Sequence, residues 1–336
     1  MGILGFTWAL AKEAPSTALA RRRRGPLRPT WSFAFENLAA TLRGFFREAM
    51  ALPPAQMRAF WEAQAAPNPA FAQVRRERVD VCAIPGEWFT PRAGYDGTML
   101  YLHGGAYVYG SARTHAELVS RLAVASRARA LLLEYRLAPE HPLPAGLNDA
   151  LAAYRSLLSS GTPPEELVVA GDSAGGGLAA ALLCALRDAG EPLPAGAALI
   201  CPWVDLFAQD PGMRENSGVD WGEAEYFPKL ATLYVGREDT KDPRASPVHA
   251  DLAGLPPLLV QVGSAELLRD QVRAFAERAK AAGVDVRLEL WPDMIHAWHL
   301  WASIFEASRR AIDQVAEFAR RRILDARDAA RRKRAS

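Results

Sequence analysis

Short apolar runs and helical stretches alternate along the chain from about residue 78 onward. Such alternation predicts an α/β fold, in which a mostly parallel, doubly wound sheet is covered by helices on both faces. In sheets of this kind, ligands bind at the carboxyl ends of the strands. The apolar runs predict strands at Thr98–Leu102, Ala130–Tyr135, Leu167–Ala170, Ala197–Cys201, Leu258–Val262 and Val286–Leu290, and apolar spacing predicts helices over about 114–127, 146–159, 174–189, 266–282 and 299–323.

Two regions break this alternation. Residues 1–75 have a helical pattern with prolines and several aromatic side chains, and residues 203–250 form an aromatic-rich excursion between two strands. An excursion of this kind is typical of a lid over a site, although ordinary surface helices are the alternative. The predicted organisation is an N-terminal helical segment over 1–75, an α/β core over 76–202 and 251–325, an inserted segment over 203–250 and a basic tail over 326–336.

The charge balance and the cysteines exclude several classes of protein. The 336 residues carry 40 basic and 38 acidic side chains, for a formal net charge of +2. Nothing in that balance favours a nucleic acid or another acidic polymer as partner. Cys82, Cys184 and Cys201 form no C-x-x-C pair, so we expect neither a disulfide framework nor a metal site from them.

The N-terminus carries features that imitate a targeting signal. Met1–Leu10 is apolar, but the basic cluster Arg21–Arg24 follows it, whereas a secretory signal places its charge first. No apolar run approaches the roughly 20 residues that a membrane-spanning helix needs. We therefore expect a cytoplasmic protein without a membrane span.

The sharpest motif is Gly171-Asp172-Ser173-Ala174-Gly175, directly between a predicted strand and a predicted helix. A G-x-S-x-G sequence in that context predicts a nucleophile elbow, a strained turn that projects the serine hydroxyl out of the sheet. A phosphate-binding loop is the competing interpretation, but such a loop would end in Gly-Lys-Ser/Thr. Ser173 is therefore the predicted nucleophile, and the Ala174 amide at the helix N-terminus is a predicted donor to a developing oxyanion.

A second motif, His103-Gly104-Gly105-Ala106-Tyr107, follows the first predicted strand. Loops of the HGGG type supply further backbone N–H donors to the oxyanion beside such elbows. Gly104 and Gly105 let the backbone approach a substrate carbonyl, and Ala106 adds only a methyl group. A plain tight turn would explain two glycines but not their pairing with an elbow. The amides of Gly104, Gly105 and Ala106 are therefore predicted oxyanion donors.

A serine hydroxyl needs a base to take its proton, and histidine is the expected one. Of the six histidines, His296 and His299 follow the last predicted strand, where the chain order Ser…acid…His places the base. His296 lies in a loop and His299 at the start of the final helical stretch. The loop position favours His296.

The acid that orients this histidine should follow the strand Leu258–Val262. Glu266 and Asp270 both lie there, one helical turn apart and on the same face. Either carboxylate could instead be an acidic first-turn residue that the helix dipole favours. Glu266 is closer to the strand end, and Asp270 remains the second candidate.

With these motifs the chain resembles the bacterial hormone-sensitive-lipase family of esterases, over at least residues 85–300. The resemblance rests on His103–Gly105, on the block Glu134–Ala145, on Gly171–Gly176 and on His296. The block is the most specific of these, because no general constraint of the fold demands its twelve residues.

The resemblance implies roles for particular residues. Ser173 would be the nucleophile and His296 the base, with oxyanion donors from the Gly104–Ala106 backbone and from Ala174. The family acid usually opens a D-x-L-x-D pattern thirty residues before the histidine, and Glu266 holds that place here. Glu for Asp is a departure that leaves Asp270, at the other end of the pattern, as a second candidate.

The resemblance also implies an α/β-hydrolase fold with a cap, built from N-terminal helices and an insertion after a middle strand. Family members act on short-to-medium acyl esters without metal or organic cofactor, and a homodimer is compatible with the family. A lactonase, an amidase or a carbamate hydrolase would use the same residues. A non-catalytic member that binds a small hydrophobic ligand is the competing class, but it would be expected to lack the serine or the histidine.

Overall fold

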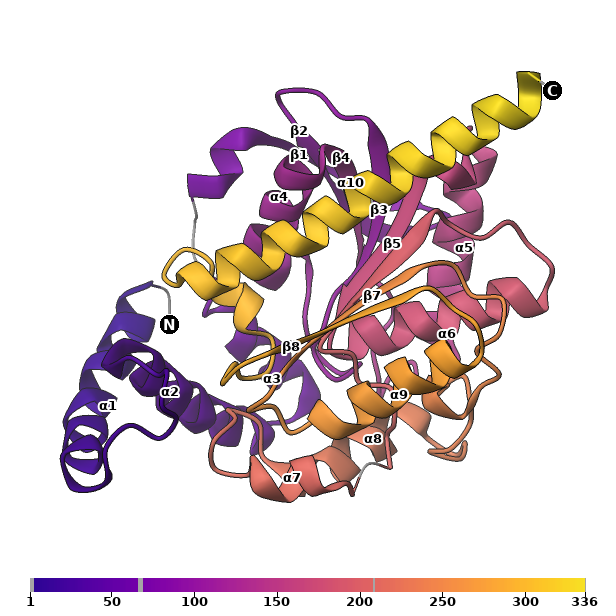
Figure 1. The fold of residues 1–336 in the computed structure, drawn as a ribbon. Coiled ribbons are helices and arrows are strands. Elements are labelled where there is room, and N and C mark those ends of the chain that lie inside the picture. The colour runs from indigo at the N-terminus through magenta and orange to yellow at the C-terminus, as the bar shows by residue number, and fades with distance from the viewer. Residues whose placement is uncertain (1–2, 66–68, 208, 336) are drawn as a thin grey trace.

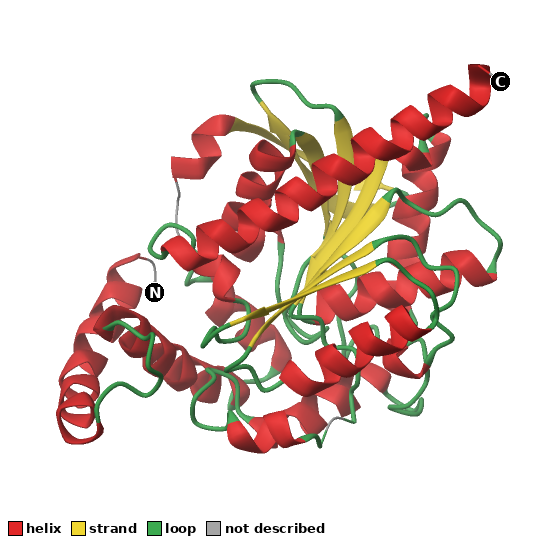
Figure 2. Cartoon of the chain, viewed as in Figure 1, coloured by secondary structure: helices red, strands yellow, loops and turns green. Residues whose placement is uncertain are grey.

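The computed structural model describes residues 3–65, 69–207 and 209–335, so parts of the predicted segments 1–75, 203–250 and 326–336 lie outside the described residues. One sheet of eight strands forms the centre (Figures 1 and 2). Its strands are β1 Val74–Val81, β2 Ile84–Pro91, β3 Gly97–Leu102, β4 Ala128–Leu133, β5 Leu167–Asp172, β6 Gly196–Ile200, β7 Leu258–Gly263 and β8 Val286–Trp291.

The strand order is β1-β2-β4-β3-β5-β6-β7-β8. From β4 to β8 all neighbouring strands run parallel, whereas β1 and β2 form an antiparallel hairpin that pairs with β4. The parallel strands β3, β5, β6 and β7 are buried along their whole length. Full burial explains why these strands appear in the sequence as continuous apolar runs. The predicted mostly parallel sheet is confirmed.

Helices cover both faces of the sheet, as predicted (Figure 1). Along β3, Met99 and Tyr101 pack with one group of helices, and Leu100 and Leu102 pack with the other. Alternate side chains of a strand point to opposite faces, so each central strand contributes to two cores. The first group is α4 Ala112–Ser126 and α10 Glu306–Ala335, and the second is α5 Ala145–Ser159, α6 Ala174–Asp188 and α9 Arg269–Ala281, with the short 3₁₀ turn η2 Pro164–Glu166 ahead of β5.

The sequence pattern misses the β1–β2 hairpin. The predicted strands correspond to β3 through β8, each within two residues at either end. In contrast, β1 reads V-R-R-E-R-V-D-V and is mostly exposed, so it offers no apolar run. Its turn, at Cys82 and Ala83, takes positive φ angles without the Gly or Asn that usually marks such a turn.

Two predicted helices begin later than expected. The last helix, α10, starts at Glu306 instead of residue 299, because Trp298–Trp301 forms the 3₁₀ turn η5 first, and it continues to Ala335. Helix α9 starts at Arg269 instead of residue 266. The fully buried Glu266 side chain accepts the N–H of Gly263, and this contact holds a turn ahead of the helix.

The N-terminal and inserted segments contact each other beside the sheet (Figure 1). Phe46 packs edge-on against Trp221 and Tyr226, and Arg47 donates to Glu223 at 2.6 Å. No helix among the described residues is long and apolar enough to cross a bilayer. The elements are α1 Ile3–Arg24, α2 Phe33–Met50, α3 Pro54–Glu62 and η1 Pro69–Gln73 in the first segment, and α7 Pro211–Glu215, η3 Ala224–Tyr226, α8 Phe227–Val235 and η4 Pro247–His249 in the second.

Candidate active site

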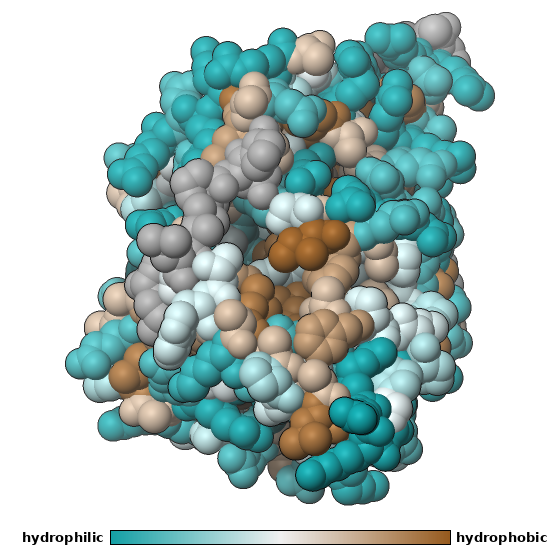
Figure 3. Space-filling view, turned by 90° about the vertical axis from the view of Figure 1, so that its left-hand side faces the viewer, coloured by the Kyte–Doolittle hydropathy of each residue, from teal (hydrophilic) through white to brown (hydrophobic). Residues whose placement is uncertain are grey.

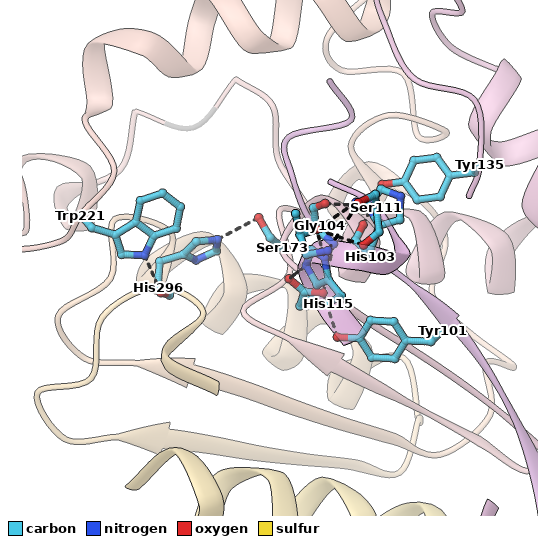
Figure 4. A network of polar contacts seen from close by, with 11 residues as sticks. Tyr101, His103, Gly104, Ser111, His115, Tyr135, Ser173, Trp221 and His296 are labelled. Atoms are coloured by element: carbon cyan, nitrogen blue, oxygen red, sulfur yellow. Dashed lines mark hydrogen bonds and ion pairs between the residues drawn. The ribbon is translucent and has the colours of Figure 1, made fainter. Parts of the chain in front are cut away.

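Ser173 lies in the turn between β5 and α6 with φ +53° and ψ −122°. Such angles are strained for a residue with a side chain, and they persist only where the surroundings enforce them. Here the Ser173 N–H donates to the Ile200 carbonyl and its own carbonyl accepts from the Trp203 N–H, both at 2.8 Å. The end of β6 and the residues that follow it therefore hold the turn on both sides. The Ser173 hydroxyl points toward His296 (Figure 4).

The glycines two positions before and after Ser173 are required by close backbone packing. A Cβ on Gly171 would lie 2.4 Å from the Gly175 carbonyl oxygen, and one on Gly175 would lie 2.0 Å from the Leu102 carbonyl oxygen. Real Cβ atoms essentially never approach backbone so closely. The elbow therefore packs directly on the end of β3, where the loop His103–Tyr107 begins.

His296 joins Ser173 to Glu266. Its Nε2 lies 2.8 Å from Ser173 Oγ, and its Nδ1 lies 2.9 Å from Glu266 Oε2. The other carboxylate oxygen of Glu266 accepts from the Gly263 N–H and from the Cys201 thiol. The structure thus brings together a hydroxyl, an imidazole and a carboxylate in hydrogen-bonded order, from β5, the loop after β8 and the loop after β7.

The alternative base and acid lie in other contacts. His299 is buried in η5, where its Nε2 lies 2.7 Å from Gln261 Oε1, and burial lowers the pKa of its imidazole to about 3. Asp270 pairs with Arg269 at 2.6 Å and accepts the Gly212 N–H at 2.8 Å. Among the described residues, no hydrogen bond or ion pair joins Asp270 to the imidazole that faces Ser173, so Glu266 is the carboxylate in hydrogen-bonding position.

The loop after β3 divides its amides between two tasks. The Gly104 N–H donates to Asp172 Oδ1 at 3.0 Å. No described residue accepts a hydrogen bond from the amides of Gly105, Ala106 or Ala174. Gly105 and Ala106 also line the cavity at Ser173. These three amides are therefore free to donate to a bound oxyanion. The Gly104 amide, which the sequence also predicts as a donor, is instead bound to Asp172 and holds the loop in place.

The buried carboxylate of Asp172 supports this loop. Besides Gly104, it accepts the Tyr101 hydroxyl at 2.8 Å and lies 3.2 Å from His115 Nε2. Burial opposes ionisation, but His115 and these hydrogen bonds outweigh it and lower the pKa of Asp172 to about 2. Asp172 belongs to the elbow motif, but the motif does not predict its role, because the residues that contact it are distant in the sequence.

The block Glu134–Ala145 supports the same loop. The Tyr135 hydroxyl donates to the His103 carbonyl at 2.7 Å, and its ring stacks on the His103 imidazole at 4.5 Å between centroids. Burial, followed by the nearby His115, lowers the pKa of His103 to about 4. His103 is therefore neutral near pH 7, and its Nδ1 lies 2.7 Å from the Gly104 carbonyl.

Negative charge surrounds the His296 imidazole. Burial alone would lower its pKa, but the hydrogen bond to Glu266 and the charges of Glu266, Asp220 and Asp172 raise the pKa above the usual histidine value. Asp220 comes from the inserted segment, and its carboxylate accepts the His296 N–H at 2.9 Å. Sequence reasoning did not single out Asp220, since one acid in an aromatic stretch carries no pattern.

A cavity of about 460 Å³ opens at Ser173. The face seen in Figure 3 is hollowed near its middle, and hydrophobic side chains gather around the hollow. Cavities of this size and character suit apolar small molecules with one polar group to be oriented. Its aromatic walls come mostly from the N-terminal and inserted segments: Phe6, Phe45, Phe46, Trp61, Phe71, Tyr109, Trp203, Trp221, Phe227 and Trp301.

One group of potential metal ligands exists among the described residues, and it overlaps this site. Cys201, Glu266 and His296 each offer a ligand atom within 4.8 Å of the others. All three atoms already take part in the hydrogen-bonded chain to Ser173. Burial and the neighbouring Glu266 raise the pKa of the Cys201 thiol well above its ordinary value, and a protonated thiol is a poor metal ligand.

Comparison with known proteins identifies the family. Residues 99–300 match the family described as having the alpha/beta hydrolase fold. An acetyl-hydrolase from Streptomyces hygroscopicus is 47% identical over 244 residues, which cover 72% of this chain and 81% of the relative. An esterase from Acinetobacter venetianus is 31% identical over 293 residues, which cover 86% of this chain and 96% of the relative.

Solved structures agree with this assignment. The crystal structure of an esterase from the bacterial hormone-sensitive lipase family superposes with a TM-score of 0.80 at 43% identity, covering 85% of this chain and 98% of that one. The chain belongs to the bacterial hormone-sensitive-lipase family. It is a carboxylic ester hydrolase with the α/β-hydrolase fold.

The close packing of this esterase's elbow yields a first prediction. Gly175→Ala would place a methyl group 2.0 Å from the Leu102 carbonyl oxygen and 2.5 Å from that of His103. Neither backbone atom can retreat without moving the elbow and the loop that faces it, and a shift of about 1 Å at a site costs roughly 100-fold in rate. We expect a loss of at least that size in kcat/KM for p-nitrophenyl butyrate.

Gly44→Ala is the matched control. A Cβ at Gly44, on α2, would meet no atom within 4 Å. This variant should keep its activity, and its urea unfolding should change by no more than about 1 kcal/mol, because Ala is the better helix former. Full activity in Gly175→Ala would contradict the packing argument.

Proposed function

We propose that this esterase hydrolyses short-to-medium acyl esters through Ser173, His296 and Glu266, by way of an acyl-enzyme intermediate. The observation that carries the proposal is the unbroken chain of two hydrogen bonds from Ser173 Oγ through His296 to Glu266. An imidazole held in this way can take the serine proton, and the carboxylate fixes its tautomer and stabilises its cation.

In the first half of the proposed reaction, His296 Nε2 takes the Ser173 proton as Oγ attacks the ester carbonyl carbon. The amides of Gly105, Ala106 and Ala174 receive the developing oxyanion, and each such donor is worth roughly 2.7–4 kcal/mol. The tetrahedral intermediate collapses when the carbon–oxygen bond to the alcohol breaks and His296 protonates that leaving oxygen. The acyl group then remains on Ser173.

In the second half, water takes the place of the alcohol. His296 removes a proton from the water as its oxygen attacks the acyl carbon, and the same amides hold the second oxyanion. Collapse of that intermediate returns the proton to Ser173 Oγ and releases the carboxylic acid. No group other than these residues and water is needed to balance the two steps.

We further propose that residues 1–75 and 203–250 act as a cap that selects the substrate. Both segments contribute aromatic walls to the cavity at Ser173. An uncharged aromatic wall favours neutral, apolar acyl or alcohol groups. A relative named acetyl-hydrolase supports the short end of the acyl range.

The proposed function is tested first at the nucleophile. Ser173→Ala should lower kcat for p-nitrophenyl acetate and butyrate by roughly 10⁶-fold, the cost of removing such a serine elsewhere, while leaving the unfolding transition in place. Turnover near the wild-type rate in Ser173→Ala would refute the nucleophile. A lactone and an anilide assayed alongside the esters distinguish a lactonase or an amidase from an esterase.

The assignment of the acid predicts an order of effects. Glu266→Gln removes the carboxylate that faces His296 Nδ1, and losing the orienting acid of such a triad costs roughly 10⁴-fold in kcat. Asp270→Asn should cost far less, because Asp270 contacts Arg269 and Gly212 instead. The reverse order in steady-state assays would move the acid to Asp270.

The charges around His296 predict the pH dependence. The imidazole must be neutral to accept a proton, so activity is lost as pH falls through its pKa. Since that pKa is raised, the acid limb of kcat/KM should have its midpoint above about pH 6.5, the ordinary histidine value. A profile between pH 5 and 9 measures it, and a midpoint below 6.5 would contradict the raised pKa.

A further inference from the structure

The inserted segment approaches the catalytic loops through six consecutive residues, Asn216–Trp221, which we call the bracket. Asp220 is 1% exposed, and its side chain accepts three backbone N–H groups. Oδ1 accepts from His296 at 2.9 Å and from Trp221 at 2.8 Å, and Oδ2 accepts from Leu267 at 2.9 Å. One carboxylate therefore bridges the loop after β7 and the loop after β8.

Two other bracket residues donate side-chain N–H groups to backbone carbonyls of the same loops. The Asn216 side-chain amide donates to the Glu266 carbonyl at 2.7 Å, and Asn216 is fully buried. The Trp221 indole N–H donates to the His296 carbonyl at 2.6 Å. With the contacts of Asp220, the bracket holds the peptide group that follows Glu266 and the peptide groups on both sides of His296.

The N-terminal segment in turn holds the bracket. Arg28 donates to the Asn216 side-chain oxygen at 2.6 Å. Arg43, on α2, donates to the backbone carbonyls of Gly218, Val219 and Asp220. One arginine between α1 and α2 and one on α2 thus connect the N-terminal segment to the bracket, and neither side chain lines the cavity at Ser173.

Burial of the Asp220 carboxylate is costly unless it serves these contacts. Burial raises the pKa of Asp220, and the charge of His296 and the N–H donors oppose that rise. None of the ion pairs found among the described residues includes Asp220. All its hydrogen-bond partners are donors, so the ionised form fits the site, and hydrogen bonds to an ionised acceptor are the stronger kind.

We propose that Asp220 is a positioning residue, which fixes Glu266 and His296 relative to each other through their own backbone and is itself held by the N-terminal segment. The inference rests on the proposed catalytic roles of Ser173, His296 and Glu266. Within the described part of the chain, the Asp220 carboxylate hydrogen-bonds only backbone N–H groups, and none of the proposed reacting atoms of Ser173 or His296. It acts on the rate through the geometry and the charge of His296.

Five charged or titratable side chains of the described residues face His296. Glu266 follows β7, Asp172 ends β5 and Asp220 comes from the bracket, and each raises the pKa of His296. The buried thiol of Cys201, after β6, and the imidazole of His299, in η5, complete the set. Removing the Asp220 charge alone should therefore lower the pKa of His296.

Asp220→Asn tests the proposal because it preserves shape while removing one acceptor and the charge. An amide can accept from only one of the two loops and turns its NH₂ toward the N–H of the other. We expect kcat for p-nitrophenyl butyrate to fall 10- to 100-fold while KM changes less than about threefold. We also expect the acid limb of kcat/KM to move to lower pH.

Asp239→Asn is the matched control, an exposed Asp in the same inserted segment, and it should leave kcat, KM and the pH profile unchanged. Wild-type kcat in Asp220→Asn would overturn the proposal. A lower kcat with an unmoved acid limb would also overturn it, because a merely structural tether would give that result. Circular dichroism and a urea melt establish that each variant is folded.

If Asp220→Asn does not fold, Arg43→Gln decides the question. This variant removes the hydrogen bonds from Arg43 to the bracket and changes no residue that lines the cavity. The proposal therefore requires a lower kcat at unchanged KM. An unchanged kcat would overturn it. Ser173→Ala in the same assay distinguishes a failure of the proposed function from a failure of the role proposed for Asp220. Activity retained there would refute the proposed function, whereas an inactive Ser173→Ala beside a normal Asp220→Asn refutes only the role of Asp220.

Discussion

The buried carboxylate of Asp172 is the contact on which the arrangement of the site depends. It stands beside Ser173 in the chain and binds the Gly104 amide, so one residue sets the elbow and the facing loop at a fixed separation. Its burial is possible because Tyr101 and His115 supply further partners. Those partners lie on β3 and α4, elements that are themselves packed into the main cores. Contacts with residues packed in the core therefore fix the positions of the Ser173 hydroxyl and of the free amides, although two of those amides lie in a loop.

The other half of the site is built differently. Glu266 and His296 lie in loops after β7 and β8, beyond the last hydrogen bonds of the sheet. Loops are more mobile than the strands they follow, so their relative position needs support from elsewhere. In the role we propose, Asp220 supplies it from the inserted segment. The site would then rest on two buried aspartates, one fixing the nucleophile against the oxyanion donors and the other fixing the base against the acid.

The sequence is most informative where a local rule leaves few choices. The elbow demands glycine on both sides of Ser173, and the chain order leaves two candidate bases, His296 and His299, and two candidate acids. Position relative to the strands favours His296 and Glu266, and the structure places this pair in hydrogen-bonding contact. The parts that the sequence does not predict are contacts between distant residues. The partners of Asp172 lie 57 to 71 positions earlier, and Asp220 contacts Leu267 and His296, which lie 47 and 76 positions later. The apolar pattern did not predict the β1–β2 hairpin, because an exposed edge strand needs no apolar run.

Helix α2 carries both residues that line the cavity and a residue that binds the bracket, and this arrangement matters for changing the substrate selectivity of the enzyme. Phe45 and Phe46 face the cavity, whereas Arg43, one turn away, holds the bracket. Positions two and three apart on one helix thus serve different purposes. If the proposed cap selects the substrate, exchanging the aromatic wall changes selectivity, whereas exchanging the arginine removes hydrogen bonds to the bracket. Mutational libraries aimed at selectivity should therefore vary the wall residues and spare their polar neighbours, because losses of rate from the latter would hide gains in specificity.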